Sequence, residues 1–141
     1  MILGRAAGLV GIAGALLLAG PARAVTGGQL LDQCSALERG AVVSGDTVRL
    51  PRGEAAASCW VYMAAVQDMG ATVEREGGPS VIGACVPPET TRLQIVQAFT
   101  RYARARRDAL DLRATALIIP ALIEAFPCPE PTEVGPSPLA R

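Results

Sequence analysis

Four cysteines, at positions 34, 59, 85 and 128, constrain the fold of this 141-residue chain more than any other feature. An even number of cysteines in a small exported domain predicts two disulfides, with three possible connectivities. Zinc binding is the competing interpretation, but the chain lacks the CxxC pair that is common in structural zinc sites. We therefore expect two disulfides and no metal site.

The first 24 residues indicate export. Arg5 precedes a charge-free run from Ala6 to Gly20, and Ala22-Arg23-Ala24 resembles a cleavage signature. This pattern is typical of a secretory signal peptide that is cleaved after Ala24. A retained membrane anchor is the disfavoured alternative, because a membrane span needs about 20 apolar residues. We expect a signal peptide over residues 1–24, one domain over 25–129 and a proline-rich, disordered tail over 130–141.

The composition of the mature chain excludes several classes of function. Without Arg5 and Arg23 it has 11 arginines and 13 acidic residues, a formal charge of −2, and it contains no histidine or lysine. Nucleic-acid binding requires a surplus of positive charge, which is missing. Histidine is the usual general base and the commonest metal ligand. We therefore predict no catalytic residues and no cofactor.

Two segments in the first half of the domain have helical features. Thr26 and Gln29 form a possible capping box, which predicts a helix from there to about Glu38. A second helix is expected over Glu54–Met69, whose apolar face comprises Cys59, Tyr62, Val66 and Met69. Residues 39–53 are interrupted by Gly and Pro and are interpreted as a loop, with a short hairpin as the minor alternative.

Two further helices are predicted after Pro88. Thr91 and Gln94 form a second capping box, so a helix should run from about Thr91 to Arg104. Its apolar stripe comprises Leu93, Val96, Phe99 and Tyr102. Asp111 is the expected N-cap of the last helix, in which Pro120 should cause a kink or a break. The apolar stripe of that helix comprises Leu112, Ala116, Ile119, Ile123 and Phe126.

The order of the helices favours one disulfide connectivity. A short connection near Asp108 predicts that the last two helices are antiparallel, which brings Cys85 close to Cys128. The same reasoning pairs Cys34 with Cys59, whereas a link between Cys34 and Cys128 would contradict it. We therefore predict an all-α domain of four to five helices, arranged as two antiparallel pairs and braced by two disulfides.

Three groups of residues are candidates for a site. An arginine cluster, with Arg104, Arg106 and Arg107, could dock on an acidic protein groove, although such a cluster is more often a solvated face. Trp60 lies off the apolar stripe of its helix and could make an exposed partner contact, although core packing is the commoner role of such an aromatic residue. A catalytic role for the carboxylates is disfavoured, because they lie at a helix end or in a connector: Asp68, Glu74 and Glu76.

The ordered segments LLDQC, CWVYMAAVQD, CVPPETTRLQIVQAF and ALIEAFPCP resemble the Rap/Tai immunity domain. The resemblance extends from about Gly28 to Pro129. Its most specific parts are Cys85-Val86-Pro87, followed by Thr91 and Gln94, and the segment Ala125-Phe126-Pro127-Cys128.

This resemblance implies a periplasmic protein, often a homodimer, that covers the active site of a peptidoglycan amidase effector of type VI secretion. It implies no enzymatic activity. The short apolar run of the signal peptide independently predicts no stable membrane insertion after cleavage. Two alternatives remain open. One is a small helical periplasmic stress chaperone or an interaction module without an amidase partner. The other is an enzyme that depends on a carboxylate or a free thiol.

Overall fold

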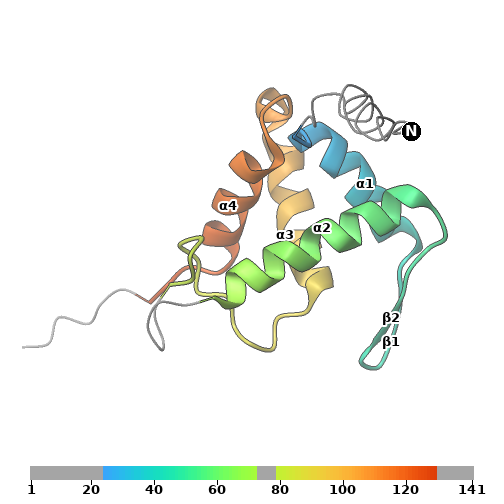
Figure 1. Ribbon diagram of the computed structural model, residues 1–141, viewed down its shortest axis with the longest axis horizontal. Helices are drawn as coiled ribbons and strands as arrows, with labels where there is room; N and C mark the ends of the chain where they lie inside the picture. The colour runs from blue at the N-terminus through green and yellow to red at the C-terminus, as the bar shows by residue number, and fades with distance from the viewer. Residues whose placement is uncertain (1–23, 73–78, 130–141) are drawn as a thin grey trace, which may run out of the picture.

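The computed structural model describes residues 24–72 and 79–129. The described part is mostly helical, with four α-helices, one 3-10 turn and one two-stranded sheet (Figure 1). The expected signal peptide, apart from Ala24, and the expected tail lie outside the described residues. No helix among the described residues combines the length and apolar character that crossing a membrane requires.

Helix α1 spans Gly27–Gly40 and begins with the capping box that the sequence predicts. The Thr26 hydroxyl accepts a hydrogen bond from the Gln29 amide, and the Gln29 side chain accepts one from the Thr26 amide. The start of the helix is also held by the segment before α4, because the Gly27 amide donates to the Leu112 carbonyl at 2.8 Å. These bonds fix α1 against a part of the chain that lies far away in sequence.

A β-hairpin follows α1, so the prediction of an all-α domain was wrong. Strand β1, Val42–Ser44, pairs with β2, Thr47–Arg49, in antiparallel register. The two-residue turn has Gly45 at φ 57°, a left-handed conformation that glycine adopts without steric cost. The Ser-Gly-Asp-Thr turn and the weak alternation after it were the local signals for this hairpin. In Figure 1 the hairpin projects away from the helices.

Helix α2 spans Glu54–Ala71 and buries a face shifted from the predicted one. Cys59 and Val66 are buried as expected, but Met69 is 40% exposed and Tyr62 is only partly buried. Met63 takes the central place in the core instead. Alanine occurs on several sides of this helix, so the sequence distinguishes the buried face from the exposed face only weakly.

Helix α3 spans Arg92–Ala105, and the predicted capping box of Thr91 and Gln94 is present. Phe99 and Val96 are fully buried, as the predicted stripe requires, whereas Leu93 and Tyr102 are partly buried at its edges. A 3-10 turn, η2, spans Arg107–Ala109 and leads toward the last helix.

Helix α4 spans Ala114–Ala125 and differs from its prediction in two respects. Its N-cap is Arg113, and not Asp111. The helix also continues through Pro120 without a break. Its buried face lies opposite the predicted stripe and comprises Ala114, Leu117, Ile118, Ala121 and Leu122. One face of α4 therefore lies outside the core.

The four helices share one hydrophobic core, in which α1 contacts all three others. A disulfide joins Cys34 of α1 to Cys59 of α2, and another joins Cys85 to Cys128, with Cα atoms 5.1 and 4.8 Å apart. The Cys85 amide also donates to the Phe126 carbonyl at 3.0 Å, so the segment before α3 is fastened to the end of α4. The grouping into two antiparallel pairs stays a prediction.

Candidate partner-binding surfaces

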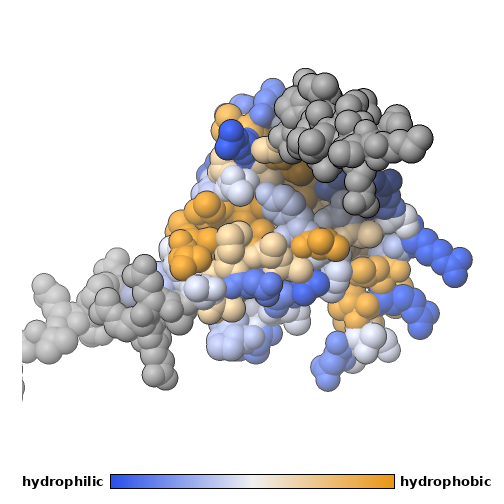
Figure 2. All heavy atoms as spheres, in the orientation of Figure 1, coloured by the Kyte–Doolittle hydropathy of each residue, from blue (hydrophilic) through white to orange (hydrophobic). Residues whose placement is uncertain are grey.

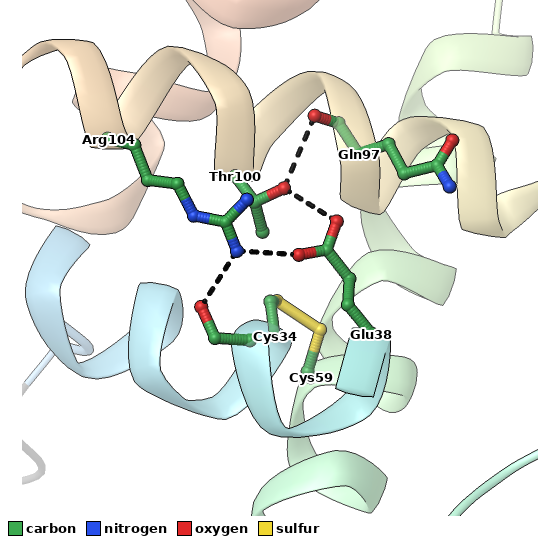
Figure 3. The surroundings of a disulfide bond; sticks show 7 residues. Cys34, Glu38, Cys59, Gln97, Thr100 and Arg104 are labelled. Carbon is green, nitrogen blue, oxygen red and sulfur yellow. Dashed lines mark hydrogen bonds and ion pairs between the residues drawn. A yellow bond between two sulfur atoms is a disulfide. The ribbon is translucent and has the colours of Figure 1, made fainter. Parts of the chain in front are cut away.

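The predicted arginine cluster is divided among different environments. Arg104 forms an ion pair with Glu38 of α1 at 2.7 Å and also donates to the Ser35 hydroxyl at 3.2 Å (Figure 3). Its charge is thus largely compensated within the fold. Thr100, which is buried, donates to the other Glu38 oxygen at 2.8 Å. Glu38 therefore ties α1 to α3 beside the Cys34–Cys59 disulfide.

The two other arginines of the cluster do not take part in this contact between α1 and α3. The Arg106 guanidinium stacks over the Tyr102 ring at 4.4 Å from the ring centre, and Arg107 is exposed in η2. Exposed carboxylates at positions 108 and 111 follow directly. The end of α3 is therefore a surface of mixed charge, and the proposed docking of this cluster on an acidic groove stays a prediction.

Trp60 is partly buried and has a specific neighbour. The Arg92 guanidinium, at the start of α3, lies 4.6 Å from the centre of the Trp60 ring. Arg92 also donates through Nε to Gln67, whose amide donates to the Thr90 carbonyl at 3.2 Å. This chain of contacts joins α2 to α3 and holds Arg92 in one orientation. Trp60 thus has a structural role, and its outer edge stays a candidate contact.

Among residues 24–72 and 79–129, the β-hairpin has the most exposed large apolar side chains outside the helices. Val42 and Val43 are each 57% exposed, and as neighbours on one strand they point to opposite sides of the sheet. Arg49, on the paired strand, is exposed, as are Arg39 and Arg52 on either side of the hairpin. The sequence analysis did not identify these residues as a site, although the Gly-Asp turn could have indicated them.

A shallow depression of about 440 Å³ lies on the outer side of α2 and is lined by Glu54, Ala57, Ser58, Val61 and Tyr62. It is wide open and contains one carboxylate. Burial raises the pKa of Tyr62 above its ordinary value of 10.0. The depression is a further candidate surface for contact with a protein.

The carboxylates considered in the sequence analysis are not brought together by the described structure. Asp68 is exposed near the end of α2, while Glu74 and Glu76 lie outside the described residues. Within residues 24–72 and 79–129, no three His, Cys, Asp or Glu side chains are grouped closely enough to bind a metal ion.

The fold and its surfaces define a small helical domain that is braced by disulfides and presents surfaces suited to protein contact. A family model of the Rap1a immunity proteins matches residues 26–128, and the chain belongs to this family. The predicted resemblance to the Rap/Tai immunity domain is thereby confirmed. Membership indicates a protein that gives immunity by binding a partner effector protein. Searches among curated proteins and among solved structures found no match.

Proposed function

We propose that the exported chain is a periplasmic immunity protein that binds and occludes a peptidoglycan amidase effector of type VI secretion. Family membership supports the immunity role, and the signal sequence expected over residues 1–24 supports export. In this proposal the protein has no catalytic activity and acts by keeping peptidoglycan out of the effector's cleft.

The hairpin is the observation that carries the binding mode. An isolated two-stranded hairpin is only marginally stable in water, and this one exposes a valine on each side. An enzyme cleft is concave and mostly apolar, so a narrow projecting hairpin is a suitable shape to enter it. Contact with Val42 and Val43 from both sides would bury apolar surface that is costly to leave exposed.

The arginines around the hairpin indicate the charge of the partner. Arg39, Arg49 and Arg52 are exposed there, while Asp46 at the turn is the only acidic residue between residues 39 and 53. An acidic rim around the cleft would therefore attract this end of the molecule and speed association. Increasing salt should then lower the association rate of the complex strongly and change its dissociation rate little.

The test uses the chain that begins at Val25 and a peptidoglycan amidase effector, taken from the neighbourhood of the gene if one is encoded there. The readouts are complex formation by calorimetry and release of fragments from purified peptidoglycan. Undiminished cleavage in the absence of any complex would overturn the proposal. If the protein instead protected unrelated proteins from acid-induced aggregation, the chaperone alternative would replace it.

Variants locate the contact. The double substitution Val42→Ser and Val43→Ser should weaken the complex at least tenfold and restore cleavage, while the unfolding midpoint stays unchanged. Val81→Ser is the matched control, because Val81 is similarly exposed, at 55%, and lies outside the hairpin, between α2 and α3. Full inhibition by the double variant would show that another surface binds the effector.

A further inference from the structure

The side of α2 that points away from the core is exposed. Its side chains follow one another at intervals of 3, 4, 4 and 3 residues, which places them on one side of the helix: Glu54, Ala57, Val61, Ala65 and Asp68. We call these five residues the outer α2 face. Within residues 24–72 and 79–129, no large apolar side chain is more exposed than Val61, at 69%. The middle of the outer α2 face is therefore an apolar surface open to contact.

The shape of the outer α2 face suits a second helix. Alanine lies before and after Val61 in the row, so another helix backbone could come close to α2, with Val61 packed between its side chains. The depression of about 440 Å³ lies along the first part of the same row and could receive one long side chain. Figure 2 shows hydrophobic side chains along the part of α2 that faces the viewer.

The charge of the outer α2 face is negative at both ends. Glu54 and Asp68 are the two charged residues of α2, which contains no basic residue. Glu54 lies in the first turn, where the helix dipole stabilises a carboxylate, but Asp68 lies in the last turn, where a negative charge is unfavourable. The stability of α2 therefore does not explain Asp68. In the part of the chain that the structure describes, the one ion pair joins other side chains.

The β-hairpin alone is too small to form a standard interface. Such an interface takes about 800 Å² from each partner, whereas each strand of the hairpin has three residues. Strand β2 ends at Arg49 and α2 begins at Glu54, so the two elements are close in sequence. In Figure 1 the hairpin and the start of α2 lie on the same side of the molecule. A partner that holds the hairpin therefore has the outer α2 face within reach.

We propose that the effector that takes up the hairpin also packs a helix with apolar and basic side chains against the outer α2 face. This inference rests on the proposed function, because one partner supplies both contacts. Apolar residues of that helix cover Val61, while its basic residues pair with Glu54 and Asp68, which lie about 21 Å apart along α2. The partner is then acidic beside the hairpin arginines and basic on this helix, which selects one orientation of the complex.

The experiment measures, by calorimetry, the affinity of the chain that begins at Val25 for the amidase effector. Val61→Glu should weaken the complex about tenfold, because it places a carboxylate against an apolar surface of the partner. Ile123→Glu is the matched control, since Ile123 is an exposed apolar residue of α4, at 43%, and this variant should bind normally. Circular dichroism verifies that both variants fold.

Charge reversal tests the pairing with basic residues. Glu54→Lys and Asp68→Lys should each lower the association rate of the complex about threefold, because each then repels a cation of the partner. Asp111→Lys is the control, since Asp111 is exposed before α4 and its substitution changes the net charge by the same amount. An equal effect of all three variants would show that only the net charge matters and would overturn the pairing.

Hydrogen exchange of the saturated effector identifies the segment that covers α2. The amides that the parent chain protects and Val61→Glu does not should lie in a helix that contains Lys or Arg. Protection lost instead from an acidic or non-helical segment would overturn the inference. Undiminished affinity of Val61→Glu would also overturn it and leave the proposed function standing, whereas the absence of any complex with the parent chain would overturn both.

Discussion

Arg104 of α3 and Glu38 of α1 form an ion pair at 2.7 Å directly beside the Cys34–Cys59 disulfide (Figure 3). The disulfide joins α1 to α2, whereas the ion pair and the Thr100 hydroxyl join α1 to α3. Three helices are therefore connected near the end of α1, through Glu38 and Cys34. The arginine that the sequence analysis assigned to partner binding is, at least in part, a residue of this connection.

Glu38→Ala should lower the free energy of unfolding by about 1 to 2 kcal/mol, because the buried Thr100 hydroxyl loses its charged acceptor. Arg104→Ala should cost less, about 0.5 kcal/mol, since its side chain is 50% exposed and water screens the pair. Urea unfolding of both variants gives the comparison. A larger effect of Arg104→Ala would show that the ion pair, and not the Thr100 hydrogen bond, holds the two helices.

The Cys34–Cys59 disulfide should contribute more to stability than Cys85–Cys128, although it closes the shorter loop. Chain-entropy estimates give about 4 kcal/mol for the Cys85–Cys128 loop and about 3.5 kcal/mol for the Cys34–Cys59 loop. Cys34 and Cys59 are fully buried, however, so replacing both with Ala also leaves a cavity in the core. In thermal unfolding, the double variant Cys34→Ala, Cys59→Ala should thus be less stable than the double variant Cys85→Ala, Cys128→Ala.

The two disulfides should also differ in how easily they are reduced, because their cysteines differ in exposure. Cys85 and Cys128 are partly exposed, so a mild reductant should open their disulfide first. Alkylation with mass mapping during a reductant titration checks the order. Simultaneous opening of both disulfides would indicate that the native state unfolds as a whole before either is reduced.

Gly27 and Gly28 provide a matched pair for the contact between α1 and α4. A Cβ at Gly27 would overlap with Leu117 Cδ1 and lie 3.3 Å from the Leu110 carbonyl oxygen. Gly27→Ala should therefore destabilise the protein by about 1 to 3 kcal/mol. A Cβ at Gly28 meets only ordinary contacts, 3.5 Å or longer, and alanine is the better helix former. Gly28→Ala should consequently be neutral or slightly stabilising.

The sequence predicted the features that depend on local interactions. Thr26 with Gln29 and Thr91 with Gln94 lie within one helical turn, so their capping boxes could be identified without knowledge of the fold. The buried face of α4 could not, because the helix is apolar on both sides. Tertiary contact decides between the faces: Leu117 packs against the side of α1 where Gly27 leaves room.

The candidate binding residues, too, were predictable only in part from the sequence. Exposed aromatic and arginine residues could be selected by type, but their neighbours could not, since Arg92 reaches Trp60 and Glu38 reaches Arg104 from distant parts of the chain. The hairpin was interpreted as a loop because its strands have three residues each, too few for periodicity to be distinctive.

Tyr62 should make the protein sensitive to alkaline pH. Burial raises its pKa in the folded state above the ordinary value of 10.0. The folded state thus keeps the phenol proton at a pH where the unfolded state releases it, so stability falls as the pH rises above about 10. Below that pH both states hold the proton, and Tyr62 contributes no pH dependence.

Tyr62→Phe removes this proton, so its unfolding midpoint in urea should fall less between about pH 9 and about pH 11 than that of the parent protein. The difference between the ultraviolet pH titrations of the two proteins isolates the ionisation of Tyr62. A midpoint for that difference at or below pH 10 would show that the phenol is open to water in the folded state. The packing of Tyr62 at the edge of the α2 depression would then be incorrect, since burial is the only cause of the raised pKa.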